Sequence, residues 1–276
     1  MVARYVCTPR LPGSVAPRPY LHPVTTLAGI PVTGFRPGDH RHHLGASLAV
    51  PLLNGTNFWG GRTFLAGRGP VGLDNHGRQR HEGWLRREPD RLLQRLTWLG
   101  RDGAPLATEE RALTARPLTA AAWVLWIDFT LRAPAGHPLT IESPASRGRA
   151  GAGYGGFFWR APAGDGPVRA FAGPGANGLH GSRLPWVALT GGPAATAWTL
   201  IFLAGDDPWF VRAEEYAGVC PALAWDRPLL VAAGEALTRR VGVIAVDGRP
   251  GPAAVPALIR LATPRPTSPA GSTGPG

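Results

Sequence analysis

Short apolar segments with a period of two recur along the chain and predict β-strands. The clearest is residues 123–131 (WVLWIDFTL), where every second position from Trp123 to Leu131 is apolar and Asp128 and Thr130 fall between them. Because alternate residues of a strand face opposite sides of a sheet, this segment is predicted to turn one face into a hydrophobic core. Similar patterns predict strands at residues 46–53, 92–99, 157–160, 186–190, 198–203, 210–212 and 237–246.

Turn signals separate these segments, and helical periodicity is scarce. Gly-rich or Asp-Gly turns fall at residues 101–103, 163–166, 191–193 and 247–248, and the pattern allows one short helix at residues 252–262. Many strands at short spacing without intervening helices indicate antiparallel sheets. We therefore expect an all-β fold, a large antiparallel β-sandwich with few short helices. Residues 1–262 would form a single domain, followed by a disordered tail at 263–276 (TPRPTSPAGSTGPG).

Composition agrees with a globular β protein. Hydrophobic residues make up 44 % of the 276-residue chain and charged residues only 17 %, which argues against a disordered chain. The 38 glycines and 30 prolines fit many turns and disfavour long helices.

The net charge of +11 comes entirely from arginine, since the chain contains no lysine. One interpretation is codon usage in a GC-rich genome, and the other is a polyanionic partner. The densest basic run, residues 76–95 (HGRQRHEGWLRREPDRLLQR), is interrupted by acidic residues and shows no basic helix with interleaved aromatics. We therefore do not expect a nucleic-acid partner.

The cysteines and the N-terminus favour a reducing, cytoplasmic compartment. Cys7 and Cys220 are far apart in sequence, so they form neither a disulfide framework nor a thiolate zinc motif. The first residues (MVARYVCTPRLPGS) contain no apolar signal-peptide core. The longest uncharged stretch, residues 184–205, is broken by Gly-Gly-Pro and predicts two strands and a turn, so no membrane association is expected.

The segment DHRHHLG, residues 39–45, is the leading candidate for chemistry, because it holds three of the eight histidines. If the segment is a strand, His40 and His42 point to the same face and can chelate a divalent metal such as zinc, manganese, iron or nickel. His81 or His76 would then supply a third ligand, with Asp39 as a ligand or an orienting partner. Metal-free histidines that transfer protons or bind substrate are the second interpretation. Histidines that merely cap a turn are the third.

Three further segments carry candidate substrate-binding or catalytic residues. NGTNFWGG offers Asn54, Asn57 and Trp59, which suit stacking on a sugar ring and hydrogen bonds to its hydroxyls. GYGGFFWR offers Tyr154 and Arg160 beside flexible backbone, and Arg160 can pair with a carboxylate or phosphate. DDPWFVRAEEYAG holds the densest carboxylate cluster, residues Asp206, Asp207, Glu214 and Glu215. Structural turns explain the first two segments equally well, and for the carboxylates solvated surface charge is the leading interpretation.

Taken together, these motifs resemble the bacterial family labelled "methane oxygenase PmoA", from about Arg18 to about Asp247. The residues that carry the resemblance are PRPYLHPV, DHRHHLG, NGTNFWGG, the spacing from Gly77 to His81, GYGGFFWR and DPWFVRAEEYAG. The resemblance implies a β-supersandwich similar to the galactose mutarotase fold and, by association, carbohydrate chemistry. That fold usually pairs a histidine acid with a late glutamate base, a role for which Glu215 is the position we expect. His43 lies outside the core of the shared pattern.

We therefore expect a carbohydrate-active enzyme that performs hydrolysis, β-elimination or epimerisation of a small sugar or glycoside, including an oxidised sugar. His40, His42 and His81, with Asp39 and Glu215, would be catalytic, and the same three histidines are the candidate metal ligands. The expected substrate-binding residues are His43, Asn54, Asn57, Trp59, His76, Tyr154 and Arg160. A non-catalytic carbohydrate-binding domain is the alternative. A metal-dependent oxygenase, as the family label suggests, is the third hypothesis.

Overall fold

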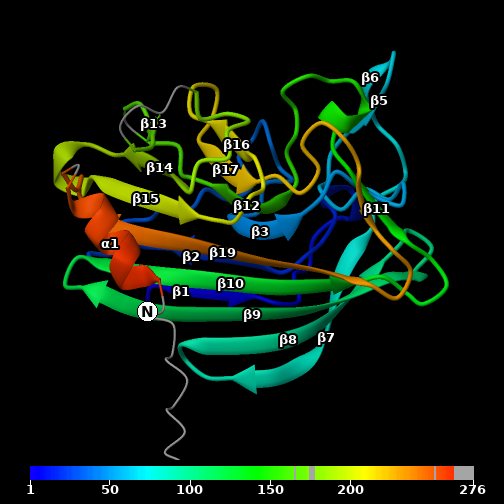
Figure 1. Cartoon of the computed structure of the whole chain (residues 1–276), viewed down its shortest axis with the longest axis horizontal. Coiled ribbons are helices and arrows are strands. Elements are labelled where there is room, and N and C mark those ends of the chain that lie inside the picture. The colour runs from blue at the N-terminus through cyan, green and yellow to red at the C-terminus, as the bar shows by residue number, and fades with distance from the viewer. Residues whose placement is uncertain (165, 174–177, 252, 264–276) are drawn as a thin grey trace, which may run out of the picture.

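A computed structural model describes residues 1–164, 166–173, 178–251 and 253–263 and confirms an all-β sandwich (Figure 1). An eight-stranded antiparallel sheet has the order β13-β14-β15-β19-β10-β9-β8-β7, and a six-stranded sheet has the order β1-β2-β3-β12-β17-β16. The strands of the first sheet are β7 (Arg78–Arg87), β8 (Arg91–Leu99), β9 (Pro105–Thr119), β10 (Ala122–Arg132), β13 (Arg169–Phe171), β14 (Trp186–Gly191), β15 (Trp198–Leu203) and β19 (Ala236–Asp247). Those of the second are β1 (Ala3–Val6), β2 (Tyr20–Val24), β3 (Ala46–Ala49), β12 (Gly156–Arg160), β16 (Trp209–Arg212) and β17 (Gly218–Pro221).

Smaller elements complete the chain. A three-stranded sheet contains β4 (Leu52–Leu53), β11 (Leu139–Glu142) and β18 (Leu229–Val231), and β5 (Thr63–Leu65) pairs with β6 (Gly69–Val71). Three single 3-10 turns are η1 (Gly13–Val15), η2 (Ala145–Arg147) and η3 (Ala194–Thr196). The short helix expected near the C-terminus is α1 (Ala254–Ala262). Its predicted first residue 252 and the predicted tail from 264 onward lie outside the described residues.

The main core lies between the two large sheets, and period-two alternation places residues there as the sequence predicted. Trp123, Leu125 and Ile127 of β10 are buried in this core with Phe157 and Trp159 of β12. Figure 1 shows β12, β16 and β17 in one layer and β9, β10 and β19 in the other. Burial of these apolar faces between two layers is the main favourable contribution to folding.

The opposite face of the eight-stranded sheet is partly covered by α1. Val124 of β10 and Ile244 of β19 belong to a second buried cluster with Val255 and Leu258 of the helix. Among the residues that the structure describes, no helix has the length and apolar character needed to cross a membrane.

The outward face of the six-stranded sheet carries the aromatic residues on which a site is built. On β12 the side chain of Phe158 points away from the core that holds its neighbours, and on β16 that of Phe210 does the same. These two rings pack with Trp59, Tyr154 and Tyr216 in a separate cluster. Tyr154 and Tyr216 are only partly buried, so this aromatic face reaches the surface of the protein.

Candidate functional site

A cavity of about 920 Å³ opens over the outward face of the six-stranded sheet. It is large enough for a small sugar-sized ligand. Its lining combines histidine, aromatic, arginine and carboxylate side chains drawn from six chain segments. The lining residues are Asp39, His40, His42, His43, Trp59, Gly60, Gly61, Arg62, Pro70, Arg149, Ala152, Tyr154, Leu179, His180, Phe210, Val211, Arg212, Ala213, Glu214, Glu215 and Tyr216.

His40, His42 and His43 lie on a tight turn, so the condition under which His40 and His42 would share one face of a strand is not met. The backbone N–H of His40 donates to Pro37 O, and that of His43 donates to His40 O. The turn brings all three rings together instead of alternating them across a sheet. The ring centroids of His40 and His43 are 4.6 Å apart, and those of His42 and His43 are 4.8 Å apart. We call the cavity wall formed by His40, His42 and His43 the histidine end.

Arg18, a fully buried side chain, holds the histidine turn in place. Its guanidinium donates to the carbonyl oxygens of Val15, Ala16, Trp59 and His42 and to Ser47 Oγ. Burial lowers the pKa of Arg18 to about 9. By bridging the His42 and Trp59 carbonyls, Arg18 fixes the distance between the two loops that line this wall of the cavity.

Two glycines of NGTNFWGG allow His42 to pack closely. A Cβ at Gly60 would lie 2.7 Å from His42 Cβ, and one at Gly61 would lie 2.9 Å from His42 Nδ1. Both glycines have positive φ, +95° and +69°. Any other residue would be strained at these positions and would push the His42 ring out of place.

The hydrogen-bond partners of His40 and His43 define opposite tautomers. His40 Nδ1 lies 2.7 Å from Asp39 Oδ2, and a carboxylate only accepts, so Nδ1 carries the proton and Nε2 of the neutral ring is an acceptor. His43 Nδ1 lies 3.2 Å from Arg160 Nη1, and a guanidinium only donates, so Nδ1 accepts and Nε2 carries the proton. One histidine is thus set as a base and its stacked neighbour as a hydrogen-bond donor.

Burial and positive neighbours keep two of the three histidines neutral. Burial, reinforced by Arg18, lowers the pKa of His42 to about 3. Burial also lowers the pKa of His43 far below its usual range, with His42, His40 and Arg160 adding to the effect. The hydrogen bond from His40 lowers the pKa of Asp39, so this carboxyl is ionised at neutral pH.

A row of aromatic rings leads from the histidine end to a second wall. His43 packs edge-on against Trp59 at 5.8 Å between ring centroids, Trp59 lies 4.6 Å from Tyr154, and Tyr154 lies 5.5 Å from Phe210. Burial raises the pKa of Tyr154 to about 12 and raises that of Tyr216 as well, so both phenols are protonated donors.

The second wall is built around Arg212, at the end of β16, and His180. His180 Nε2 lies 2.8 Å from Gly151 O and Nδ1 accepts from the Val211 N–H, which sets the Nε2–H tautomer. Arg212 Nη2 donates to the same Gly151 O, and its guanidinium carbon lies 4.7 Å above the Phe210 ring. We call this wall, which Arg149 also lines, the arginine end.

The sequence matches, over residues 1–260, the family described as "Family of unknown function (DUF6807)". The chain belongs to this family. No curated protein matches the chain. The resemblance to the "methane oxygenase PmoA" family and to the galactose mutarotase fold stays a prediction.

Seven of the twelve catalytic or substrate-binding residues predicted from the sequence line the cavity. They are Asp39, His40, His42, His43, Trp59, Tyr154 and Glu215. Asn54, Asn57, His76, His81 and Arg160 are not among the described residues that line it.

Four of these five support loops or neighbouring side chains. Asn57 Oδ1 accepts from the Trp59 and Gly60 N–H groups, and His76 Nε2 lies 2.7 Å from Gly61 O. Asn54 bonds to the backbone of Pro138 and Thr140. Arg160 contacts His43 and lies 4.4 Å above the Tyr216 ring, so it positions groups of the site and does not line it.

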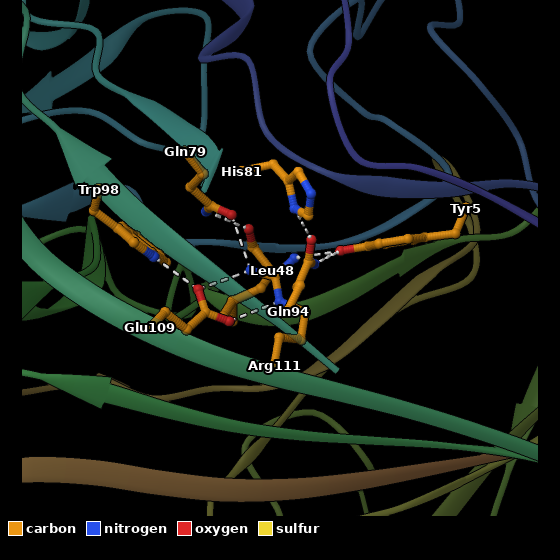
Figure 2. Close-up of polar contacts among 8 residues, drawn as sticks. All are labelled: Tyr5, Leu48, Gln79, His81, Gln94, Trp98, Glu109 and Arg111. Atoms are coloured by element: carbon orange, nitrogen blue, oxygen red, sulfur yellow. Dashed lines mark hydrogen bonds and ion pairs between the residues drawn. The ribbon is translucent and has the colours of Figure 1, made fainter. Parts of the chain in front are cut away.

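His81 lies in a different part of the sandwich, within a buried polar network between the two sheets (Figure 2). Its Nδ1 lies 2.8 Å from Gln94 Oε1, and Gln94 also contacts Tyr5. The predicted group of His40, His42 and His81 is therefore not formed. Over residues 1–164, 166–173, 178–251 and 253–263, no three His, Cys, Asp or Glu side chains are grouped in a way suited to hold a metal ion.

The residues of the arginine end were missed from the sequence, although one signal for them existed. The period-two reading of Phe210–Arg212 as a strand puts Phe210 and Arg212 on the face opposite Val211, which the structure confirms. The candidates that the sequence offers in that segment are its carboxylates. His180 and Arg149 lie in loops without a regular pattern, so only the tertiary fold brings them to the cavity.

Proposed function

We propose that this protein is an enzyme that transfers protons on a small sugar substrate, at a carbon next to a carbonyl group. The observation that carries the proposal is the stacked pair of histidines with opposite tautomers, His40 and His43, 4.6 Å apart in one cavity. Abstraction of such a proton needs a base for the carbon and a donor for the oxygen that becomes negative.

The roles follow from the partners of each ring. His40 Nε2 takes the proton from carbon, and Asp39 stabilises the imidazolium that forms. The electron pair of the C–H bond moves toward the carbonyl oxygen, where the His43 Nε2–H donates to the developing enolate. His43 suits this role because its lowered pKa keeps it a neutral donor whose strength does not change with pH in the physiological range.

Protonation of the enolate on its other face by a solvent proton, while His40 releases its proton to water, gives epimerisation. Departure of a group from the next carbon with its bonding electrons gives β-elimination. Hydrolysis by two carboxylates has less support, because Asp39 is engaged with His40 and the remaining cavity carboxylates, Glu214 and Glu215, are exposed. The ring faces of Trp59 and Tyr154 supply an apolar surface for the sugar.

The test measures hydrogen–deuterium exchange at carbon atoms of the sugar. A panel of oxidised (keto) sugars is incubated with the protein in D2O, and the exchange is monitored by NMR. We expect the wild-type protein to exchange a C–H next to the carbonyl of one panel member. His40→Gln should lose this activity by about 100-fold or more, the usual contribution of a positioned base. His137→Gln changes an exposed histidine that does not line the cavity and serves as the matched control. Undiminished exchange in His40→Gln would refute the assigned base.

A non-catalytic sugar-binding protein is the second candidate, favoured by the aromatic row that crosses the cavity. It predicts that wild type and His40→Gln bind a sugar with the same affinity and that neither catalyses exchange.

A further inference from the structure

The arginine end of the cavity has donors that the proposed proton-transfer chemistry does not use. Arg212 and Arg149 both line the cavity, and within the described part of the chain neither pairs with a carboxylate. We infer that the substrate carries an acidic group, a carboxylate or a phosphate, which binds at the arginine end while the reacting carbon lies at the histidine end. This inference rests on the proposed sugar substrate and adds its chemical class.

Arg212 is held in one orientation before any ligand arrives. Its Nη1 donates to Val211 O and to His180 Nδ1, and its Nη2 donates to Gly151 O, while the Phe210 ring supports the flat face of the guanidinium. The five N–H groups of arginine exceed these partners, and over the described residues no hydrogen bond from Nε is formed. A fixed guanidinium with spare donors suits an oxyanion, because little side-chain freedom is lost on binding.

His180 strengthens this arrangement by remaining neutral. Burial lowers the pKa of His180, and its Nε2–H is committed to Gly151 O. The ring thus shares with Arg212 the task of fixing the Gly151 carbonyl. The same loop carries Arg149 two residues earlier, so the two arginines reach the cavity from adjacent segments.

The phenol groups extend the set of donors toward the sugar ring. Tyr154 and Tyr216 both line the cavity, and their raised pKa values keep them protonated at neutral pH. In the part of the chain that the structure describes, neither hydroxyl has a protein hydrogen-bond partner. An acidic substituent on a sugar would be met by guanidinium and phenol donors together.

The carboxylates of the cavity do not cancel this charge. Asp39 belongs to the histidine end, where it is bonded to His40. Glu214 and Glu215 are exposed to solvent in the segment that follows Arg212, and no ion pair joins either of them to a described residue. Water therefore screens them more strongly than it screens the half-buried Arg212.

The test is calorimetric titration with three sugars that differ only at carbon 6: D-glucose, D-glucuronate and D-glucose 6-phosphate. Inorganic phosphate and acetate are titrated separately as simple anions. We expect one acidic sugar to bind at least about tenfold more tightly than glucose, and its affinity to fall as salt is added. The acidic sugar that binds distinguishes a carboxylate from a phosphate site.

Variants then locate the binding. Arg149 is exposed, so Arg149→Gln should fold normally, and Arg212→Gln removes the fixed guanidinium. Each variant should bind the acidic sugar about tenfold more weakly than wild type and should bind glucose with unchanged affinity. Arg169→Gln, an exposed arginine of β13 outside the cavity, is the matched control and should bind as wild type does.

The first two outcomes below separate this inference from the proposed function. If glucose binds as tightly as both acidic sugars, the acidic-group inference is overturned and a sugar substrate stands. If an anion binds in an arginine-dependent manner but no sugar adds to its affinity, the arginine site is supported and the sugar substrate fails. If neither sugars nor anions bind, or if Arg169→Gln weakens the binding as much as Arg149→Gln does, the inference is overturned.

Discussion

Substitution of Glu109 by glutamine should destabilise the protein strongly, because it removes the one carboxylate from the buried network of Figure 2. Glu109 Oε1 accepts from Arg111 Nε at 2.6 Å, and Oε2 accepts from Arg111 Nη2 at 2.9 Å and from Trp98 Nε1 at 2.7 Å. The side chains of Arg111 and Glu109 are 2 % and 0 % exposed. Water therefore cannot solvate the arginine that the substitution leaves behind.

The same network joins the two sheets, which adds to the expected effect. Arg111 Nη2 donates to Gln79 Oε1 at 2.9 Å, and Gln79 Nε2 donates to the Leu48 carbonyl of β3. Breaking a buried ion pair by removing one partner costs about 3–5 kcal/mol of unfolding free energy. For a chain of this size, that corresponds to a decrease in Tm of about 6–20 °C.

The assay is urea and thermal denaturation followed by circular dichroism. Glu110→Gln is the matched control, because the neighbouring Glu110 forms an exposed pair with Arg95 at 3.1 Å with side chains 53 % and 63 % exposed. An exposed pair is worth at most about 1 kcal/mol, so this variant should resemble wild type. The double variant Glu109→Leu/Arg111→Met should recover part of the loss, because it leaves no unpaired charge. Equal stability of Glu109→Gln and Glu110→Gln would refute the reasoning.

Three further predictions concern the cavity walls. The pKa of His42 is lowered to about 3 and that of His43 is also lowered, whereas both are near 6.5 in an unfolded chain. Below about pH 6.5 the unfolded state therefore binds more protons than the folded state. As the pH decreases, the free energy of unfolding should fall with a limiting slope of about 2.7 kcal/mol per pH unit. Urea denaturation at pH values from 8 to 5 that shows no such fall would contradict this prediction. Gly61→Ala should lower the Tm more than Gly67→Ala does. The φ angles of the two glycines are similar, +69° and +72°, but only a Cβ at position 61 would contact His42. Equal Tm values for the two variants would argue against this close contact. Asn57→Ala leaves the Trp59 and Gly60 N–H groups without their acceptor and should lower the free energy of unfolding by about 1–3 kcal/mol, measured in urea.

Alternation along the chain predicted the strands whose buried faces are apolar, and it failed where a buried face is polar. Strand β10 was recognised because Trp123, Leu125 and Ile127 fill every second position. Strand β9 was missed although it spans 15 residues. Its inward positions include Glu109 and Arg111, which are buried as an ion pair, so the expected apolar alternation is absent there.

The candidate site was predicted in part, and its missing half shows the limit of local pattern. The histidines and Trp59 stand in dense, unusual motifs, and the cavity contains them. His81 has the same side chain as His40, but strand pairing places it beside Gln94. The arginine end is built from three separate segments. His180 and Arg212 both donate to the Gly151 carbonyl oxygen, and Arg149 lines the same cavity.

The amino-acid sequence by itself determined the class of fold, because a period of two and frequent turn residues act over a few neighbouring positions. It also determined which types of side chain are available for chemistry. Only the tertiary structure decided that His40 and His43 stack with opposite tautomers, since each tautomer depends on a partner, and Arg160 reaches His43 from 117 residues away. Hydrogen-bond partners and burial are properties of the packed chain, and they give a histidine its chemical role.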